Sequence, residues 1–476
     1  MGQEIKTASF TVEDFERFSD RLKQETAHLR RMFDDNRFAS EHEVAGFELE
    51  AWLIDGATRP APVNEEFLDA LADPLVVHEL SRFNVELNST PQVLKADALS
   101  LMSSELEMRW QRCTDTAADM HIRLAMTGIL PVVREQELTL QNMSAVKRYK
   151  AINEQVLKLR HGSPLELSIQ GVENLQTEHY DVMLESAATS FQVHLQVRPE
   201  LAARYFNAAC IVSAPIVAVA ANSPYLFGKD LWHETRIPLF EQSVNTSESG
   251  SLARTGRRRV TFGHGYIDNS LIELFDENLD LYPVLLPETH QYDAAQLYHL
   301  QLHNGTIWRW NRPLIGLGED GFHLRIEHRV IPAGPTITDM MANAALFYGL
   351  ARALAYQAVP PESQIAFDDI RKDFYRAARD GLSAEIDWPG RGQVNVSELL
   401  CSELIPLAGE GLAELGINDS DITRLMQIIN DRAESGQTGS AWQRQYCAQH
   451  KCSFQEMTEA YLANQQKGLP VHEWTI

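Results

Sequence analysis

Four segments, spread over nearly 300 residues of the chain, alternate apolar and polar side chains. They span residues 46–53, 83–88, 191–197 and 322–329. Strict alternation is typical of a β-strand with one buried face, since successive side chains point to opposite sides. The polar faces carry Glu48, Glu50 and Trp52 on the first; Asn84, Glu86 and Asn88 on the second; Gln192, His194 and Gln196 on the third; and His323, Arg325, Glu327 and Arg329 on the fourth.

Helical patterns separate these strands. Apolar residues at helical spacing predict a helix over 12–34, which Thr11 and Asp14 would cap. Further helices are expected over residues 100–126, 146–160 and 204–221, and from Thr338, as the cap, to about 357. From 361 to the end the pattern is mostly helical. No Pro-, Gly- or Ser-rich linker divides the chain. We therefore expect a catalytic core over 1–360, with a helical C-terminal part over 361–476 packed on it.

The polar strand faces have an unusual composition for surfaces that meet water. Glu48 and Glu50 would lie roughly 6–7 Å apart at about 3.3 Å per residue. Carboxylates this close repel each other unless a cation lies between them. Carboxylates with one imidazole and no thiolate indicate a site for Mg²⁺ or Mn²⁺. Arg325 and Arg329 flank Glu327 on the same face. They either bind phosphate or carboxylate oxygens or compensate the charge of the acids.

The charge balance limits the partners. Forty-two Lys and Arg stand against 66 Asp and Glu, a net charge of −24. This argues against nucleic acid or an anionic membrane as the main partner. The apolar run 208–221 is too short to span a bilayer and contains Pro215. Five scattered cysteines and an N-terminus without an apolar signal core favour a reducing, cytoplasmic location.

Five blocks, in order along residues 46–355, resemble the glutamate–cysteine ligase family, especially its bacterial carboxylate–amine ligase branch. They are Gly46-Phe47-Glu48-Leu49-Glu50; Glu79 and Glu86 before Asn88-Ser89-Thr90-Pro91; Val193-His194-Leu195-Gln196-Val197; Ala221-Asn222-Ser223-Pro224; and Ile326-Glu327-His328-Arg329.

This resemblance implies an α+β, glutamine synthetase-like fold, in which a curved, mostly antiparallel sheet forms a funnel covered by helices. It also implies ATP and Mg²⁺, with Mn²⁺ as an alternative. Catalytic roles would fall to Glu327 and Arg329, the latter holding the transferred phosphoryl group. Substrate binding would fall to Arg259, Tyr266 and Arg312, with Arg259 gripping the substrate carboxylate. The implied metal ligands are Glu48, Glu50, Glu79, Glu86, His194 and Glu327.

By the same resemblance, the chain would join a carboxylate to an amine through an acyl phosphate. The γ-carboxylate of glutamate and the amine of cysteine are the first choices. Three alternatives stay open: the same chemistry with another amine, a nucleotide-binding pseudoenzyme or regulatory protein, and phosphotransfer to a guanidino group. The expected partners are small molecules, and the oligomeric state is open.

Three further signals favour structural roles. The glycine pattern over 316–321 precedes a strand, so it predicts a turn rather than a dinucleotide site. His299 and His303 lack the glutamate of a zinc helix and are interpreted as ordinary histidines. Trp308 and Trp310 either pack in the core or form the wall of a nucleobase or substrate site.

Overall fold

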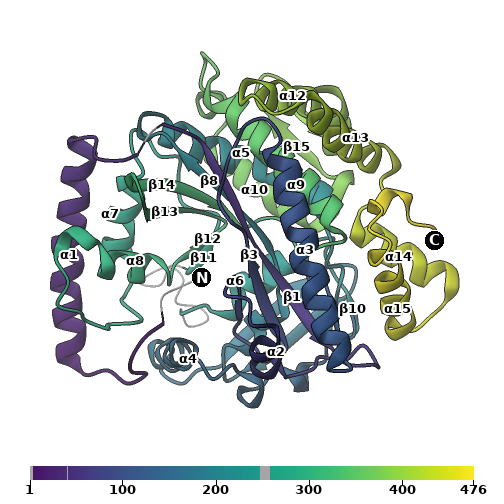
Figure 1. Cartoon of the computed structure of the whole chain (residues 1–476), viewed down its shortest axis with the longest axis horizontal. Helices are drawn as coiled ribbons and strands as arrows, with labels where there is room; N and C mark the ends of the chain where they lie inside the picture. Colours follow the sequence, from purple (N-terminus) through teal and green to yellow (C-terminus); the bar gives the residue numbers. More distant parts are fainter. Residues whose placement is uncertain (1–3, 40, 247–257) are drawn as a thin grey trace.

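A strongly curved sheet runs through the middle of the protein (Figure 1). The computed structural model describes residues 4–39, 41–246 and 258–476. Within them, six strands follow the order β13 (Asn311–Gly318), β14 (Gly321–His328), β8 (Phe191–Val197), β1 (Val44–Ile54), β3 (Asn84–Asn88) and β2 (Val76–His78). Two short strands, β4 (Gln92–Val93) and β5 (Arg123–Ala125), also pair with β1. Every pairing in this sheet is antiparallel.

The register of the sheet brings the predicted polar faces together. Glu50 lies opposite Glu86 across the β1–β3 pair, and Glu327 lies opposite His194 across the β14–β8 pair. The apolar side chains of these strands, such as Leu49, Val85 and Val193, are completely buried. One face of the sheet therefore builds the core, and the other collects the carboxylates, the imidazole and the arginines.

Helix α1 (Val12–Asp34) begins and ends where the sequence predicts. A capping box of Thr11 and Asp14 closes its first turn. Phe18 and Leu22 are among the side chains it buries, and it packs on α7 (Ile272–Leu281) and α8 (Tyr298–Asn304), as Figure 1 shows. The other helices before residue 336 are α2 (Asn64–Leu71), α3 (Ala98–Asp119), α4 (Lys147–Leu159), α5 (Ala202–Ala220) and α6 (Arg236–Ser243).

Two helix predictions need correction. The helix expected over 100–126 ends at Asp119, because residues 123–125 pair with β1 as β5. Helix α9 (Ile337–Ala355) begins one residue before the expected cap. The hydroxyl of Thr336, not that of Thr338, accepts the hydrogen bond from the Asp339 N–H.

Helix α5 is the apolar run seen in the sequence. With the preceding turn it forms a 22-residue stretch, Pro199–Ala220, that is long and apolar enough to cross a membrane. The expectation that this run is too short is thus corrected. However, 94% of the apolar window is buried inside the protein, against α9 and α10 (Phe367–Asp380). In this structure, α5 is a core helix.

The C-terminal part is mostly helical, as predicted, with one added hairpin. Its elements are α10, the hairpin β15 (Glu385–Trp388) and β16 (Gly392–Asn395), α11 (Val396–Leu399), α12 (Ile405–Glu414), α13 (Asp419–Ser435), α14 (Gly439–His450) and α15 (Phe454–Gln465). Helices α12 and α13 pack on α9, so this part shares the main core. Helices α14 and α15 lie at the far edge and hold a small apolar cluster around Trp442.

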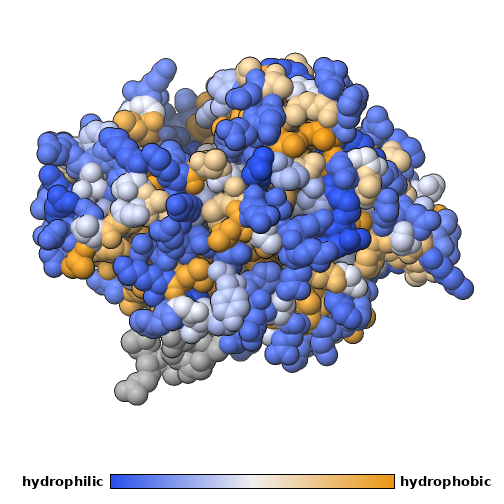
Figure 2. Space-filling view, turned by 90° about the horizontal axis from the view of Figure 1, so that it is seen from below, coloured by the Kyte–Doolittle hydropathy of each residue, from blue (hydrophilic) through white to orange (hydrophobic). Residues whose placement is uncertain are grey.

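Small two-stranded elements complete the fold. They are β6 (Leu165–Gln170) with β7 (Asn174–His179), β9 (Tyr225–Leu226) with β10 (Lys229–Asp230), and β11 (Val260–Thr261) with β12 (Trp308–Arg309). The glycine pattern over 316–321 forms the turn between β13 and β14, as predicted. Seen from below, the surface is mostly hydrophilic, with apolar side chains in small groups (Figure 2).

Candidate active site

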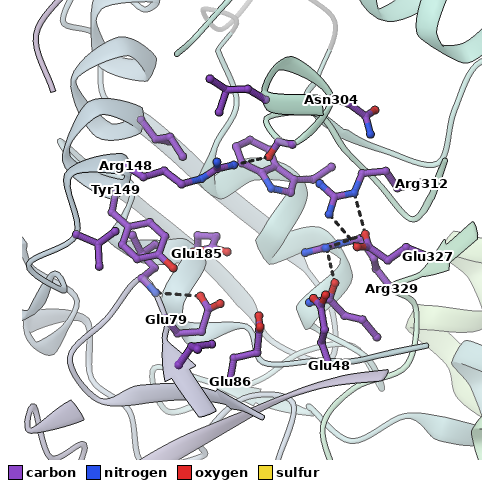
Figure 3. A pocket seen from close by; sticks show the side chains of 18 of the residues that line it. Glu48, Glu79, Glu86, Arg148, Tyr149, Glu185, Asn304, Arg312, Glu327 and Arg329 are labelled. Atoms are coloured by element: carbon purple, nitrogen blue, oxygen red, sulfur yellow. Dashed lines mark hydrogen bonds and ion pairs between the residues drawn. The ribbon is translucent and has the colours of Figure 1, made fainter. Parts of the chain in front are cut away.

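A cavity of about 780 Å³ lies over the polar face of the sheet (Figure 3). Strands β1, β3, β8, β13 and β14 supply one wall, and α4 and the end of α8 supply another. All six predicted metal ligands line it: Glu48, Glu50, Glu79, Glu86, His194 and Glu327. Arg312 and Arg329 line it as well. The structure thus brings together residues that lie far apart in the sequence.

The first of two ligand groups consists of Glu48, His194 and Glu327, with ligand atoms within 4.8 Å of one another. His194 Nε2 lies 3.3 Å from a Glu48 oxygen and 3.8 Å from a Glu327 oxygen. Neither ring nitrogen of this buried histidine has a hydrogen-bond partner among the described residues. A buried imidazole without such a partner is costly unless it binds another group.

The second group consists of Glu50, Glu79 and Glu86, whose oxygens also lie within 4.8 Å of one another. Glu50 and Glu86 come from neighbouring strands, and Glu79 directly follows β2. The Ser190 N–H and the Gln192 amide donate to Glu50, and the Asn88 amide donates to Glu86. The Leu80 N–H donates to Glu79 at 2.9 Å.

Crowding in the second group changes its acidity. Burial, followed by the charges of Glu86 and Glu50, raises the pKa of Glu79 well above its usual range. Burial, with the charges of Glu48 and Glu50, also raises the pKa of Glu86 to about 7. The group therefore holds protons near neutral pH unless a cation compensates its charge.

Arg312 and Arg329 lie beside Glu327 on the side of the cavity away from Glu79 (Figure 3). Arg312 donates two hydrogen bonds of 2.8 Å to the two oxygens of Glu327, and Arg329 donates a third of 2.9 Å. Although burial acts against ionisation, these guanidinium groups lower the pKa of Glu327 to about 2. Arg329 also donates to Gln192, and Arg325 lines the cavity beside Glu327.

The residues in the cavity fit divalent metal ions. Two compact groups offer carboxylate oxygens and one imidazole, the ligand set typical of Mg²⁺ and Mn²⁺. The imidazole without a hydrogen bond and the raised carboxyl pKa values are what a site built around cations would show in their absence. The arginine side of the cavity, with Arg312, Arg325 and Arg329, is suited to an anion. A phosphate chain held between metals and arginines would use both sides.

Two predicted substrate residues do not reach the cavity. The guanidinium of Arg259 is fully buried and donates to the backbone carbonyls of Thr306 and Pro283. Tyr266 packs edge-on against Phe367. Neither side chain lines the cavity, so the structure does not bring the predicted carboxylate-gripping arginine to the site. Its neighbour Arg257 lies outside the described residues.

The structure also places the two histidines and the two tryptophans that the sequence singled out. His299 and His303 are buried, and His299 Nδ1 donates to Glu25. The donor is assigned to Nδ1 because Nε2 accepts from the backbone N–H of His290. Trp308 lines the cavity, whereas Trp310 is buried in the core and donates to Glu241.

Sequence reasoning missed several polar residues of the cavity wall, among them Arg148, Tyr149 and Glu185. Arg148 and Tyr149 lie on α4, and Arg148 donates to the backbone carbonyl of Gly305 across the cavity. Glu185 lies on a short 3-10 turn, Met183–Ala187, before β8. A turn has no periodic pattern that marks which side chains face a site. Burial and the charge of Glu50 raise the pKa of Glu185 to about 8.

Comparisons with known proteins agree with this geometry. Residues 44–467 match the family described as glutamate-cysteine ligase family 2 (GCS2). A glutamate–cysteine ligase from Francisella tularensis, solved in complex with AMP, is 12% identical with a TM-score of 0.57. The match covers 92% of this chain and 90% of that one. A bifunctional glutathione synthetase from Pasteurella multocida is 10% identical with a TM-score of 0.50, over 93% of this chain and 55% of that one. A search of curated protein sequences finds no match.

Proposed function

The chain belongs to glutamate–cysteine ligase family 2, a family of ATP-dependent carboxylate–amine ligases, and from this premise we propose that it joins the γ-carboxylate of glutamate to an amine. Cysteine is the first amine to test. The observation that supports this proposal most is the single cavity that combines two acidic ligand groups with Arg312 and Arg329. The relative with the higher TM-score, from Francisella tularensis, binds AMP, which supports ATP as the co-substrate here.

The proposed reaction has two steps. A carboxylate oxygen of the acid forms a bond to the γ-phosphorus of ATP, and ADP leaves with the electron pair of the broken P–O bond. The acyl phosphate that results is a good electrophile, whereas a free carboxylate is not. The acceptor nitrogen then bonds to the acyl carbon, and phosphate leaves with the C–O electron pair. An ammonium acceptor gives up two protons, one of which ends on phosphate and one in solvent.

The arginines of the cavity would stabilise the phosphoryl group during its transfer from ATP to the acid. Arg329 carries a permanent positive charge: although burial acts against ionisation, the charges of Glu327 and Glu50 hold its pKa above the ordinary value. Its guanidinium can hold the phosphoryl oxygens through forked hydrogen bonds. Arg312 orients Glu327 through two such bonds. Together they place positive charge where phosphoryl transfer develops negative charge.

The two acidic ligand groups would bind the metal ions that the reaction needs. Glu48, His194 and Glu327 would hold one metal ion, and Glu50, Glu79 and Glu86 would hold another. Bound Mg²⁺ would neutralise the phosphate oxygens of ATP and make the γ-phosphorus more electrophilic. The walls around these groups limit water, which would otherwise hydrolyse the acyl phosphate. Trp308 and Tyr149 line the remaining space, where a nucleobase or a substrate side chain can pack.

A substrate screen tests the proposed function. The purified protein is incubated with ATP, Mg²⁺, glutamate and a panel of amines, and phosphate release and product mass are measured. We expect phosphate release that requires both acid and amine, and an amide product. A different acid or amine would revise the substrate and keep the reaction class. ATP binding without turnover on any pair would favour the pseudoenzyme, and a phosphoguanidino product would favour the kinase.

A further inference from the structure

We propose that Glu185 is the anchor for the acceptor substrate, which it binds as a primary ammonium ion. This inference rests on the proposed function and deepens it, because it assigns a residue to the amine half of the reaction. The residue would act by binding and positioning the acceptor next to the acyl phosphate.

The Glu185 side chain differs from the other carboxylates of the cavity in its lack of a partner among the described residues. Seven carboxylates line the cavity, and six of them have a hydrogen bond or ion pair to the protein: Glu4, Glu48, Glu50, Glu79, Glu86 and Glu327. The Glu185 carboxylate has neither with any described residue. A partly buried carboxylate is unfavourable when left alone. A ligand that brings N–H donors and positive charge would satisfy it.

The position of Glu185 relative to the two ligand groups also suits a second substrate. Glu185 lies outside both sets of ligand atoms that come within 4.8 Å of one another. It is nevertheless close enough to Glu50, Glu79 and Arg329 to interact with their charges. Arg329 already donates to Glu327 and Gln192, and forms no ion pair with Glu185. The carboxylate therefore lies beside the phosphoryl-transfer groups without being one of them, where the second substrate must arrive.

The cavity walls near Glu185 are partly aromatic. Figure 3 shows Glu185 deep in the cavity, on the side of Tyr149. The ring of Phe240 lines the main cavity and also a small pocket that Glu185 shares with Arg329. Val182 adds an apolar side chain next to it. The ring of Tyr149 on this side can attract an alkylammonium ion, since ring faces attract cations, whereas the Phe240 ring already has the Arg329 guanidinium 5.8 Å from its centre.

The turn that carries Glu185 is held firmly. The Val182 N–H donates to the Asn153 side chain on α4 at 3.0 Å, and the Ser186 hydroxyl donates to the Met183 carbonyl. Met183, Leu184 and Ala187 are buried. The carboxylate is thus fixed in place before any ligand binds, which reduces the entropy cost of binding.

The test compares two nucleophiles in the wild-type protein and in Glu185→Gln. One is the ammonium acceptor found in the substrate screen, and the other is hydroxylamine, which is mostly uncharged at neutral pH and traps the acyl phosphate as a hydroxamate. We expect the KM for the ammonium acceptor to rise about 10- to 100-fold, the usual cost of losing a hydrogen bond to a charged group. The hydroxamate rate and the KM for ATP should stay unchanged. Glu185→Asp, which keeps the charge, should restore part of the affinity.

Control variants separate the possible outcomes. Glu79→Gln should lose hydroxamate and amide together, and Glu178→Gln, on the exposed face of β7, should change neither. If Glu185→Gln loses both products equally, or if it keeps wild-type affinity for the acceptor, the anchor is wrong. If the wild-type protein forms no hydroxamate with any acid, the proposed function is wrong and the anchor falls with it. Melting curves confirm that each variant is folded.

Discussion

Glu327 contacts both the arginines of the cavity and the histidine of the first ligand group. It accepts hydrogen bonds from Arg312 and Arg329 and lies 3.8 Å from His194 Nε2. Its pKa of about 2 keeps it ionised at every pH where the protein would work. It therefore links the arginine side of the cavity to the first ligand group, and both sides depend on its charge.

Replacing Glu327 with glutamine should stop turnover. The substitution keeps the volume but removes a metal ligand and the shared partner of two arginines. We expect kcat to fall by more than about 100-fold, beyond the usual cost of losing an outer-shell partner of a metal site. Glu48→Gln should behave in the same way. The matched control is Glu319→Gln, in the exposed turn of the same hairpin. Near wild-type turnover of Glu327→Gln at ordinary Mg²⁺ would show that the metal assignment is wrong.

The crowded carboxylates should make the metal-free protein sensitive to pH. The pKa values of Glu86 and Glu185 are about 7 and 8 in the folded protein, well above those of unfolded glutamate. Between those values the folded state binds more protons than the unfolded chain, so the free energy of unfolding should fall as pH rises from about 5 to about 8. The slope is up to about 1.4 kcal/mol per pH unit for each group. Denaturant unfolding in EDTA measures it.

A substitution and a metal provide the controls for this pH effect. Glu50→Gln removes a charge that raises the pKa of both Glu86 and Glu185, so the stability of this variant should fall less over the same range. Added Mg²⁺ should also flatten the slope, because a bound cation lets the carboxylates ionise. If the wild-type protein in EDTA is equally stable at about pH 5 and about pH 8, the carboxylates are not crowded as described.

At the level of helices and strands, much of the fold could be predicted from the sequence. Alternation identified β1, β3, β8 and β14, because each has one apolar face. The pairing of the strands could not be predicted, because no local sequence signal places Glu50 opposite Glu86. Glu185 was missed because its 3-10 turn has no periodic pattern of apolar and polar residues. Arg259 was misplaced because a run of arginines does not reveal which one turns inward, and this one is held by backbone carbonyls.

The contact between α9 and α12 offers a test of how the C-terminal part is attached. A Cβ atom at Gly411 would lie 2.0 Å from the carbonyl oxygen of Gly349, so the two helices meet backbone to backbone. Gly411→Ala should therefore lower the free energy of unfolding by about 1–3 kcal/mol, the usual cost of overpacking. Equilibrium unfolding in denaturant measures the change.

Gly409, on the same helix, provides the matched control. A Cβ atom there would make only an ordinary contact of 3.6 Å with Ile422. Gly409→Ala should stabilise the protein by up to about 1 kcal/mol, because alanine favours a helix more than glycine does. If both variants have the same effect, the helices do not pack as closely as described, and the C-terminal part is attached less tightly to the core.

For the molecule as a whole, one apolar core connects α1 to α13, and the polar face of the sheet is enclosed within it. The chain carries a net charge of −24, and seven carboxylates line the cavity. ATP is itself highly negative and would meet a repulsive field on the acidic side. Nucleotide binding should therefore depend on divalent metal throughout.

A thermal shift experiment measures this dependence. ATP with Mg²⁺ should raise the melting temperature far more than ATP with EDTA, because only a ligand that binds the folded state stabilises it by mass action. Mg²⁺ alone should give a smaller shift, and Glu79→Gln should reduce the combined shift. Equal shifts with and without metal would instead place the nucleotide at a site away from the two ligand groups.

Oxygen transfer from the acid to phosphate tests the central claim most directly. Glutamate labelled with ¹⁸O in its γ-carboxylate, or the labelled acid that the screen identifies, is converted with ATP, Mg²⁺ and the amine. The released phosphate is then analysed by mass. An acyl phosphate predicts that one labelled oxygen passes into phosphate in every turnover, since the carboxylate oxygen that bonds to phosphorus leaves with it. Amide formation with unlabelled phosphate, or phosphate release that does not require the acid, would contradict it.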